Sequence, residues 1–330
     1  MKISIIITHY KEPWEICKPL FDSIEMQLGV NFENDIELII VNDSMEDNDH
    51  LNGDKLEYYP FKHVKVAYTG HVGVSEARNM GLSLAEGEYV MFCDIDDRFI
   101  SAYALHTMMK QFVTKYYIIK TPFVEDQVID GELKLIRHEG DVSFVHGKMF
   151  RKEFLDENNI RFKKELTIHE DGYFNVIANI LAKGKIHETS PALYLWKYNE
   201  NSVVRKDRDL YIYKTYGNLM DCRIAICESL WDREYVTEYF QAVAKTVIDS
   251  YFDFQKHDAL KPENKELIES AEKEFARFYD KFREDYKQIG INDIALMMHA
   301  CRVTAFMNGL KVEQETISEF LTRIVKTYLT

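Results

Sequence analysis

Three carboxylates lie within four residues at the end of an apolar run, at Asp94, Asp96 and Asp97. Carboxylates this close repel one another and raise each other's pKa. A divalent cation removes the conflict, and Mg²⁺ or Mn²⁺ takes oxygen ligands together with substrate phosphates. The segment therefore predicts a metal site on Asp94 and Asp96, where the ion would neutralise charge on a leaving diphosphate. The alternative is a solvated acidic turn in which Asp97 is the N-cap of a helix.

Two other polar side chains also follow apolar runs. Thr8 ends the run 2–8, and Asp43 comes just after the run 35–41. Both runs have the composition of strands buried on both faces, as in parallel sheets. Ligands of open α/β sheets bind beyond the carboxyl ends of the strands. We therefore expect Thr8, Asp43 and Asp94 to share one site.

The elements that carry these residues alternate along the first part of the chain. Pro13 suits the start of a helix, and Ser75 suits the N-cap of another. The order strand, helix, strand, strand, helix, strand is that of an open α/β sheet. The expected strands are 2–8, 35–41, 64–68 and 89–93, and the expected helices are 14–27, 75–85 and 171–181.

The character of the sequence changes after about Arg208. Apolar residues then recur at helical spacing, and Pro262 is the single proline. The pattern predicts roughly five helices joined by short loops. This gives an α/β domain at 1–208 and an α-helical domain at 209–330. The second domain would bind the acceptor, mediate homo-oligomer formation or dock on a membrane surface, and the sequence leaves these three roles open.

Bulk properties narrow the functional classes. The formal net charge of −14 disfavours nucleic acid as a partner, because binding to nucleic acid relies on Lys and Arg. A local basic groove would not be visible in the net charge of the whole chain. No apolar run approaches the about 18 residues of a membrane span, and the N-terminus does not read as a signal peptide. The five cysteines are scattered and form no CxxC pair. We therefore expect a cytoplasmic protein, with peripheral membrane association left open.

Seven segments in order resemble family 2 glycosyltransferases with the GT-A fold. The most specific are 73–82, which reads GVSEARNMGL, and 87–97, which carries the aspartates as a DxD motif. The resemblance covers about residues 1–205. It implies a GT-A nucleotide-sugar-binding, Rossmann-like α/β domain followed by a mostly α-helical C-terminal domain. The matching segments are 4–12, 38–44, 73–82, 87–97, 147–151, 160–162 and 169–171.

The resemblance also implies a donor site. Tyr10 would stack on the base and Asp43 would accept the uracil N–H, while Arg78 would contact the diphosphate or pair with an aspartate. The alternative roles are a surface aromatic for Tyr10, an ordinary turn residue for Asp43 and a structural ion pair for Arg78. His71 departs from the family, which often has Asn there. The expected donor-binding residues are Thr8, Tyr10, Glu12, Asp43, Arg78, Asp94 and Ile95.

Asp171 is the residue that the resemblance assigns as catalytic base. An inverting transfer needs a base for the acceptor hydroxyl proton, and an ionised Asp near its reference pKa supplies one. The alternative is that Glu170 and Asp171 only stabilise the first turn of a helix. Relatives often carry a His or basic residue near the diphosphate in the segment that closes the domain. Lys197 or Arg205 would take that role here, and the alternative is that this segment is a packing strand and loop. His146 and His169 are further candidate site residues, with a structural role as their alternative.

These observations lead to one reading of the chemistry. We expect an inverting, Mn²⁺- or Mg²⁺-dependent transfer from a UDP-sugar to a hydroxyl of a cell-surface glycan or teichoic-acid-like polymer. Alternatives are transfer to a modified DNA base or a protein, or a non-catalytic nucleotide-sugar-binding protein. The loop 8–13 has no glycine, which disfavours a nucleotidyltransferase and a dinucleotide-binding dehydrogenase. Two-carboxylate glycosidases need no metal-binding aspartates.

Overall fold

The structure is a computed structural model, and it describes residues 1–44, 51, 53–129, 131–198, 208–256, 262–307, 310 and 313–329. The chain forms two compact units, residues 1–200 and residues 201–330. Among the described residues, no helix is both long and apolar enough to cross a membrane.

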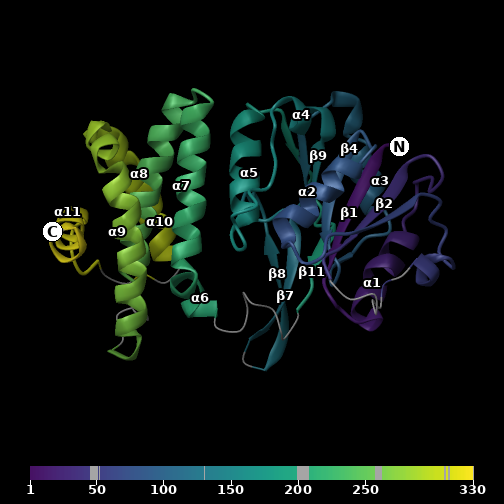
Figure 1. Ribbon diagram of the computed structural model, residues 1–330, viewed down its shortest axis with the longest axis horizontal. Helices are drawn as coiled ribbons and strands as arrows, with labels where there is room; N and C mark the ends of the chain where they lie inside the picture. Colours follow the sequence, from purple (N-terminus) through teal and green to yellow (C-terminus); the bar gives the residue numbers. More distant parts are fainter. Residues whose placement is uncertain are drawn as a thin grey trace. The chain divides into compact units, whose positions relative to one another are not determined.

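A seven-stranded mixed sheet forms the centre of the first unit (Figure 1). The parallel pairs β1–β2, β2–β3 and β1–β4 confirm the predicted α/β pattern. The sequence did not predict that β9 lies antiparallel between β4 and β6. The strands are β1 (Ile3–His9), β2 (Ile36–Asn42), β3 (Val64–Tyr68), β4 (Tyr89–Asp94), β6 (Ile118–Lys120), β9 (Lys148–Arg151) and β10 (Ile186–Glu188).

Helix α2 (Val74–Leu84) packs against β1 and β2, and a glycine permits this close contact. A Cβ on Gly81 would lie 2.3 Å from the Ile6 side chain. The prediction that Ser75 caps this helix is wrong: Gly73 is the N-cap residue, and the Ser75 hydroxyl donates to the Leu166 carbonyl instead. The other helical segments of this unit are α1 (Trp14–Glu25), α3 (Ala104–Met109), α4 (Lys152–Glu157), α5 (Glu170–Leu181) and the short 3₁₀ turns Gly53–Leu56 and Phe112–Thr114.

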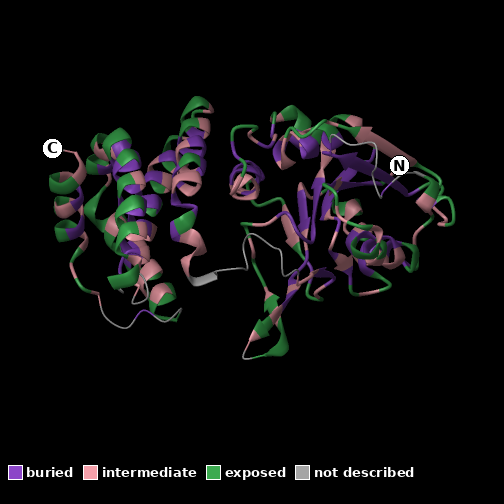
Figure 2. Ribbon diagram, turned by 60° about the horizontal axis from the view of Figure 1, so that its bottom comes forward, coloured by how far each residue is buried: buried purple, intermediate pink, exposed green. Residues whose placement is uncertain are grey.

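A second, four-stranded sheet has the order β5–β11–β7–β8. Its longest pairing is the antiparallel hairpin of β7 and β8, which projects from the body of the unit (Figure 2). The residues just after β8 and before β9 lead into the site described below. The strands are β5 (Arg98–Phe99), β7 (Phe123–Ile129), β8 (Glu132–His138) and β11 (Tyr194–Trp196).

The second unit is helical, as predicted, with six helices among the described residues where roughly five were expected. Buried aromatic side chains, including Tyr251 and Phe275, form its core. Helix α10 differs from its neighbours, because Met298 is its only buried residue. The helices are α6 (Arg208–Lys214), α7 (Tyr216–Asp232), α8 (Val236–Asp253), α9 (Lys265–Gln288), α10 (Ile291–Met307) and α11 (Ile317–Tyr328), with a 3₁₀ turn at Pro262–Asn264.

Candidate functional site

A pocket of about 460 Å³ opens at the carboxyl ends of β1, β2 and β4. Every residue expected to bind the donor lines it, as does Asp96, whereas Asp171 lies just behind the wall formed by Arg78 and Glu170. The sequence did not anticipate a lining role for His9, Gly73, Val74 or Ala77. The lining residues are Thr8, His9, Tyr10, Glu12, Asp43, His71, Gly73, Val74, Ala77, Arg78, Asp94, Ile95, Asp96 and Glu170.

Strand register explains why residues distant in sequence meet here. Thr8 on β1 is the direct partner of Asp94 on β4, and Asp43 follows the last residue of β2. The Asp43 carboxylate accepts bonds from the Thr69 hydroxyl (2.7 Å) and from the amides of Val72 (2.7 Å) and Gly73 (2.8 Å). Asp43 therefore holds the loop before α2 against the sheet. Carboxylate oxygens have two lone pairs each, so these bonds still leave acceptor capacity toward the pocket.

Two aromatic rings face each other at one wall of the pocket. Tyr10 and His71 stack with their centroids 4.8 Å apart and their planes 24° apart. Tyr10 remains 43% exposed, and the Lys11 ammonium also lies over its ring, 5.6 Å from the centroid. The Tyr10 amide donates to the Glu12 carboxylate at 2.6 Å, which fixes the loop after β1. Burial, together with the nearby charge of Asp96, raises the pKa of Glu12.

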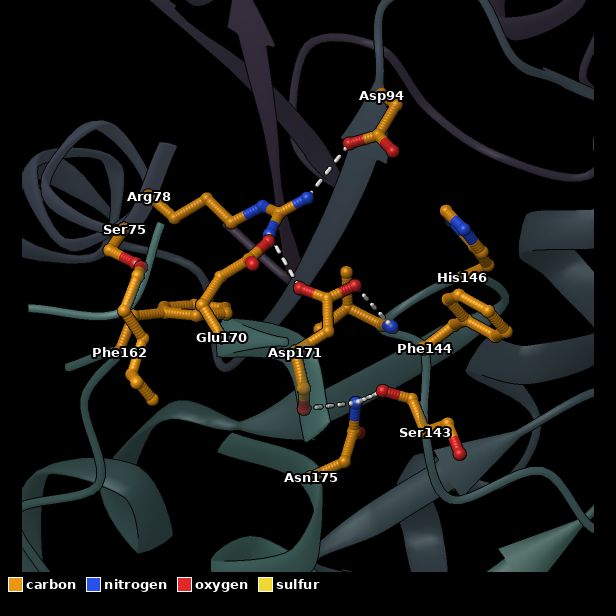
Figure 3. Close-up of polar contacts among 12 residues, drawn as sticks. Ser75, Arg78, Asp94, Ser143, Phe144, His146, Phe162, Glu170, Asp171 and Asn175 are labelled. Carbon is orange, nitrogen blue, oxygen red and sulfur yellow. Dashed lines mark hydrogen bonds and ion pairs between the residues drawn. The ribbon is translucent and has the colours of Figure 1, made fainter. Parts of the chain in front are cut away.

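Arg78 joins three carboxylates from two further elements (Figure 3). Its Nη2 donates to Asp94 at 2.9 Å, and its Nη1 donates to Glu170 at 2.8 Å and to Asp171 at 2.5 Å. The guanidinium also lies over the ring of Phe162, 5.3 Å from its centroid. This side chain is 4% exposed, so its charge is largely shielded from water. Arg78 thus links the acidic end of β4 to the first turn of α5.

Asp171 has a different protonation behaviour from the one expected. Burial raises its pKa to about 7, with Arg78 opposing the rise and the charges of Glu170 and Asp94 adding to it. The expectation of an ordinary aspartate pKa did not include this burial. The second carboxylate oxygen accepts from the Val145 amide at 3.2 Å, so the side chain is held from both sides. A carboxylate with a pKa near neutrality is suited to general base catalysis at neutral pH.

The acidic segment divides its side chains between two environments. Asp96 lines the pocket next to Glu12, while Asp97 is buried and accepts from the Tyr194 hydroxyl and the Lys197 amide, each at 2.9 Å. Asp97 is therefore not the helix N-cap of the alternative reading. Burial raises the pKa of Asp97, whereas Arg78 lowers the pKa of Asp94 despite its burial.

One group of side chains could hold a metal ion by its geometry. One ligand atom each from Asp94, Asp97 and His146 lies within 4.8 Å of the other two. Burial lowers the pKa of His146, so its imidazole is neutral at pH 7 and able to bind a cation. Oxygen and imidazole donors together fit a divalent first-row transition ion. Asp96 does not belong to this group.

Lys197 and Arg205 were the basic residues expected near the diphosphate. The Lys197 ammonium pairs with Asp126 and is absent from the pocket lining. Arg205 lies outside the described residues. His169 precedes α5 with a backbone φ of 65°. Arg78 is the one Lys or Arg among the described residues that line the pocket.

The comparisons with known proteins agree on one family. Residues 4–176 match the model of the family described as glycosyl transferase family 2. Glycosyltransferase GlyG of Streptococcus pneumoniae serotype 4 is 25% identical over 259 residues, which cover 68% of this chain and 80% of that protein. The poly(ribitol-phosphate) beta-glucosyltransferase of Bacillus spizizenii is 30% identical over 206 residues, covering 56% of this chain and 30% of that protein.

Solved structures show the same fold. The crystal structure of S. aureus TarS matches with a TM-score of 0.59 and 19% identity, over 95% of this chain and 55% of that one. Its fragment 1–349 in complex with UDP-GlcNAc matches with a TM-score of 0.52 and 18% identity, over 92% of each chain. This chain therefore spans about half of the longer TarS structure. The predicted GT-A fold with a largely helical C-terminal part is confirmed.

Proposed function

The chain belongs to glycosyl transferase family 2 and is a glycosyltransferase, and from this premise we propose an inverting, divalent-metal-dependent transfer from a UDP-sugar. One observation carries the proposal: a single buried cation, Arg78, contacts both the acidic end of β4 and Asp171. Arg78 would then fix the position of the base relative to a donor bound in the pocket. Such fixed placement of reacting groups is a large part of catalysis.

The nucleotide end of the pocket supports a UDP donor. Tyr10 offers a partly exposed ring for the base, and Asp43 keeps acceptor capacity for the uracil N–H. Thr8, Glu12 and Ile95 complete this wall. The TarS fragment of similar fold is a complex with UDP-GlcNAc, which agrees with a UDP-sugar.

Asp171 is proposed as the base. Its carboxylate removes the proton of the acceptor hydroxyl while that oxygen attacks the anomeric carbon from the face opposite the diphosphate. The bond between that carbon and the diphosphate oxygen breaks, and the nucleoside diphosphate leaves with the electron pair. The Val145 amide and Arg78 hold the carboxylate in place during this transfer. An α-linked donor therefore yields a β-linked product.

The metal is proposed to sit at the acidic segment, as Mn²⁺ or Mg²⁺, with Asp94 and Asp96 as the ligands predicted from the sequence. When bound, such an ion neutralises charge on the departing diphosphate. One oxygen of Asp94 already accepts a hydrogen bond from Arg78. The Arg78 guanidinium would therefore also lie close to the charge of the departing diphosphate. Both carboxylates line the pocket and so face the donor phosphates.

For the acceptor, we propose a hydroxyl of a polyol-phosphate polymer of the teichoic-acid type. The support is the 30% identity over 206 residues to a poly(ribitol-phosphate) beta-glucosyltransferase. We place the reaction in the cytoplasm, in accord with the free cysteines, four of which are buried. Transfer to a modified DNA base or a protein is the competing proposal, and a negative net charge disfavours nucleic acid.

The helical unit is proposed to mediate self-association through α10. Its face opposite α8 exposes Leu296, Ala300, Val303 and Met307, which follow the 4-3-4 spacing of a coiled-coil seam. Arg302 is the only Lys, Arg, Asp or Glu between residues 294 and 307. A helix lying on a membrane surface would carry a basic polar face, so a second copy of the chain fits better.

The direct test of the function is transfer with defined substrates. UDP-glucose, UDP-GlcNAc and UDP-galactose would be incubated with Mn²⁺ and with poly(ribitol phosphate) or poly(glycerol phosphate). We expect metal-dependent UDP release with one donor and a β-linked product by NMR. An α-linked product would overturn the inverting mechanism. Absence of both UDP release and UDP binding would overturn the donor proposal.

A further inference from the structure

His146 is a buried histidine whose Nδ1 has no hydrogen-bond partner in the part of the chain that the structure describes. Its side chain is 4% exposed. A buried polar atom without a partner is costly, so it calls for an explanation such as an ion. We infer that His146 is a nitrogen ligand of the divalent ion, together with Asp94 and Asp97. This inference rests on the metal dependence of the proposed function, and it replaces Asp96 with Asp97 and His146 in the ligand set predicted from the sequence.

The distances fit ligands around one ion better than a hydrogen bond. Nδ1 of His146 lies 3.6 Å from Oδ2 of Asp97, which is too long for a hydrogen bond. Two ligand atoms that each lie about 2.1 Å from one ion are separated by roughly 3.0–3.5 Å. A ligand atom of Asp94 falls within the same 4.8 Å cluster. A contraction of this cluster around a cation would bring all three side chains to ligand distance.

The imidazole is held rigidly in this position. Its ring stacks with Phe144, Trp196 and Tyr194 at centroid distances of 5.3, 5.4 and 5.7 Å. The loop before it is tied down by Asp141, which accepts from the Phe144 amide at 3.0 Å. Such packing fixes the direction of the imidazole in advance, which lowers the entropic cost of binding an ion.

Asp97 is oriented by its own partners. The Tyr194 hydroxyl donates to Oδ2 and the Lys197 amide donates to Oδ1. Each carboxylate oxygen keeps a second lone pair, so these bonds leave room for a metal. Hydrogen-bonded carboxylates are the usual arrangement in metal sites, because the outer partners fix the ligand geometry. Tyr194 therefore stacks on the proposed ligand His146 and donates a hydrogen bond to the proposed ligand Asp97.

The proposed ligand set changes which ion the enzyme should prefer. A site on Asp94 and Asp96 alone offers only oxygen, which suits Mg²⁺. An imidazole nitrogen favours first-row transition ions over Mg²⁺. We therefore expect Mn²⁺ to bind more tightly than Mg²⁺. Asp96 remains on the pocket side, beside Glu12.

The test is electron spin-echo spectroscopy of Mn²⁺ bound to the full chain in the presence of UDP. The wild-type protein should show modulation from one histidine ¹⁴N, and ¹⁵N-histidine labelling should replace that signal, which excludes the uracil nitrogens. His146→Gln should abolish the signal and weaken Mn²⁺ binding at least about 10-fold, the scale of losses at metal sites. Asp96→Asn is the matched comparison and should keep the nitrogen signal.

Two outcomes would overturn the inference and are distinguishable. If Mn²⁺ binds to the wild-type protein without nitrogen modulation, His146 is not a ligand, while the proposed function stands with Asp94 and Asp96. If no Mn²⁺ binds with or without UDP, the metal dependence of the proposed function fails as well. Absence of nitrogen modulation in the wild-type spectrum refutes the inference by itself, so the inference remains testable even where His146→Gln lowers the stability of the fold.

Discussion

Nη1 of Arg78 lies 2.5 Å from Oδ1 of Asp171, so the proposed base is in contact with the cation that also binds Asp94. The pair joins α2 to α5 across the carboxyl end of the sheet (Figure 3). A positive charge beside a carboxylate favours its ionised form. Arg78 is thus placed to limit how far burial raises the pKa of the base. The first two predictions follow from this contact.

Replacement of the proposed base should remove most activity without disrupting the fold. Asp171→Asn keeps the shape of the side chain and one oxygen that can accept from Arg78, but it loses the acceptor for the Val145 amide and cannot take a proton. General base catalysis contributes about 10²–10⁴-fold, so kcat should fall by that range. Glu170→Gln is the matched control, because Glu170 also pairs with Arg78, at 2.8 Å.

The Glu170→Gln variant should lose less than about 10-fold in kcat, and both variants should bind UDP as the wild type does. Steady-state kinetics and calorimetric titration with UDP measure the two quantities. Equal losses in both variants would indicate that the ion-pair cluster matters as a whole and that Asp171 is not the base.

The pH dependence of the reaction should report the state of Asp171. Its pKa is raised to about 7, and the base acts only when deprotonated, so kcat/KM should rise with pH and level off above about 7. Below that pH the rate should fall tenfold per unit. Arg78 opposes the rise in pKa, so Arg78→Lys, which cannot contact three carboxylates in the same geometry, should move the acidic limb to higher pH.

Rate profiles from pH 5 to 9 with both enzymes test this prediction. Circular dichroism at each pH separates unfolding from titration. A limb that stays in place in Arg78→Lys would show that Arg78 does not tune the base. A wild-type profile that stays flat down to pH 5 would show that Asp171 keeps an ordinary aspartate pKa.

The sequence anticipated the strand-end residues because the periodicity of a buried strand also marks where the strand stops. Thr8, Asp43 and Asp94 each follow an apolar run, and parallel pairing brings those ends together. The antiparallel insertion of β9 carries no such signal, since a four-residue strand has little periodicity of its own.

Other features depend on tertiary contacts that local patterns do not encode. The cluster of His146 with Asp97 brings together residues about 50 positions apart, through the loop that enters β9. Ser75 has the residue type of an N-cap, but its hydroxyl finds a carbonyl from the segment before α5. The pKa of Asp171 likewise follows from burial, which residue type alone does not reveal.

Removal of the Tyr10 ring should weaken nucleotide binding. Stacking of a base on an aromatic ring contributes about 1–3 kcal/mol, so Tyr10→Ala should raise the Kd for UDP by roughly 5- to 150-fold. Tyr10→Phe keeps the ring and should bind UDP within about twofold of the wild type. Calorimetric titration distinguishes them. Equal Kd values for Tyr10→Ala and the wild type would place the base elsewhere, for example on His71, which stacks with Tyr10.

Charges introduced on α10 should dissociate the proposed oligomer. Leu296 is 71% exposed and Val303 is 48% exposed, although both are apolar and lie one heptad apart. Two copies packed antiparallel would place the small Ala300 opposite Val303 and Leu296 opposite Met307, as in a seam that alternates small and large residues. Leu296→Glu with Val303→Glu would bury two carboxylates per chain in such a seam, at a cost that a helix pair cannot offset.

We therefore expect light scattering to give a dimeric mass for the wild type and a monomeric mass for this double variant. Ala295→Glu adds a carboxylate at an exposed position on the flank of the same helix and should leave the dimer intact. A wild-type protein that is monomeric at the highest concentration measured would refute self-association through α10. A double variant that stays dimeric would place the contact on another surface. In either case UDP binding should be unchanged, because α10 belongs to the unit 201–330 and the pocket to the unit 1–200.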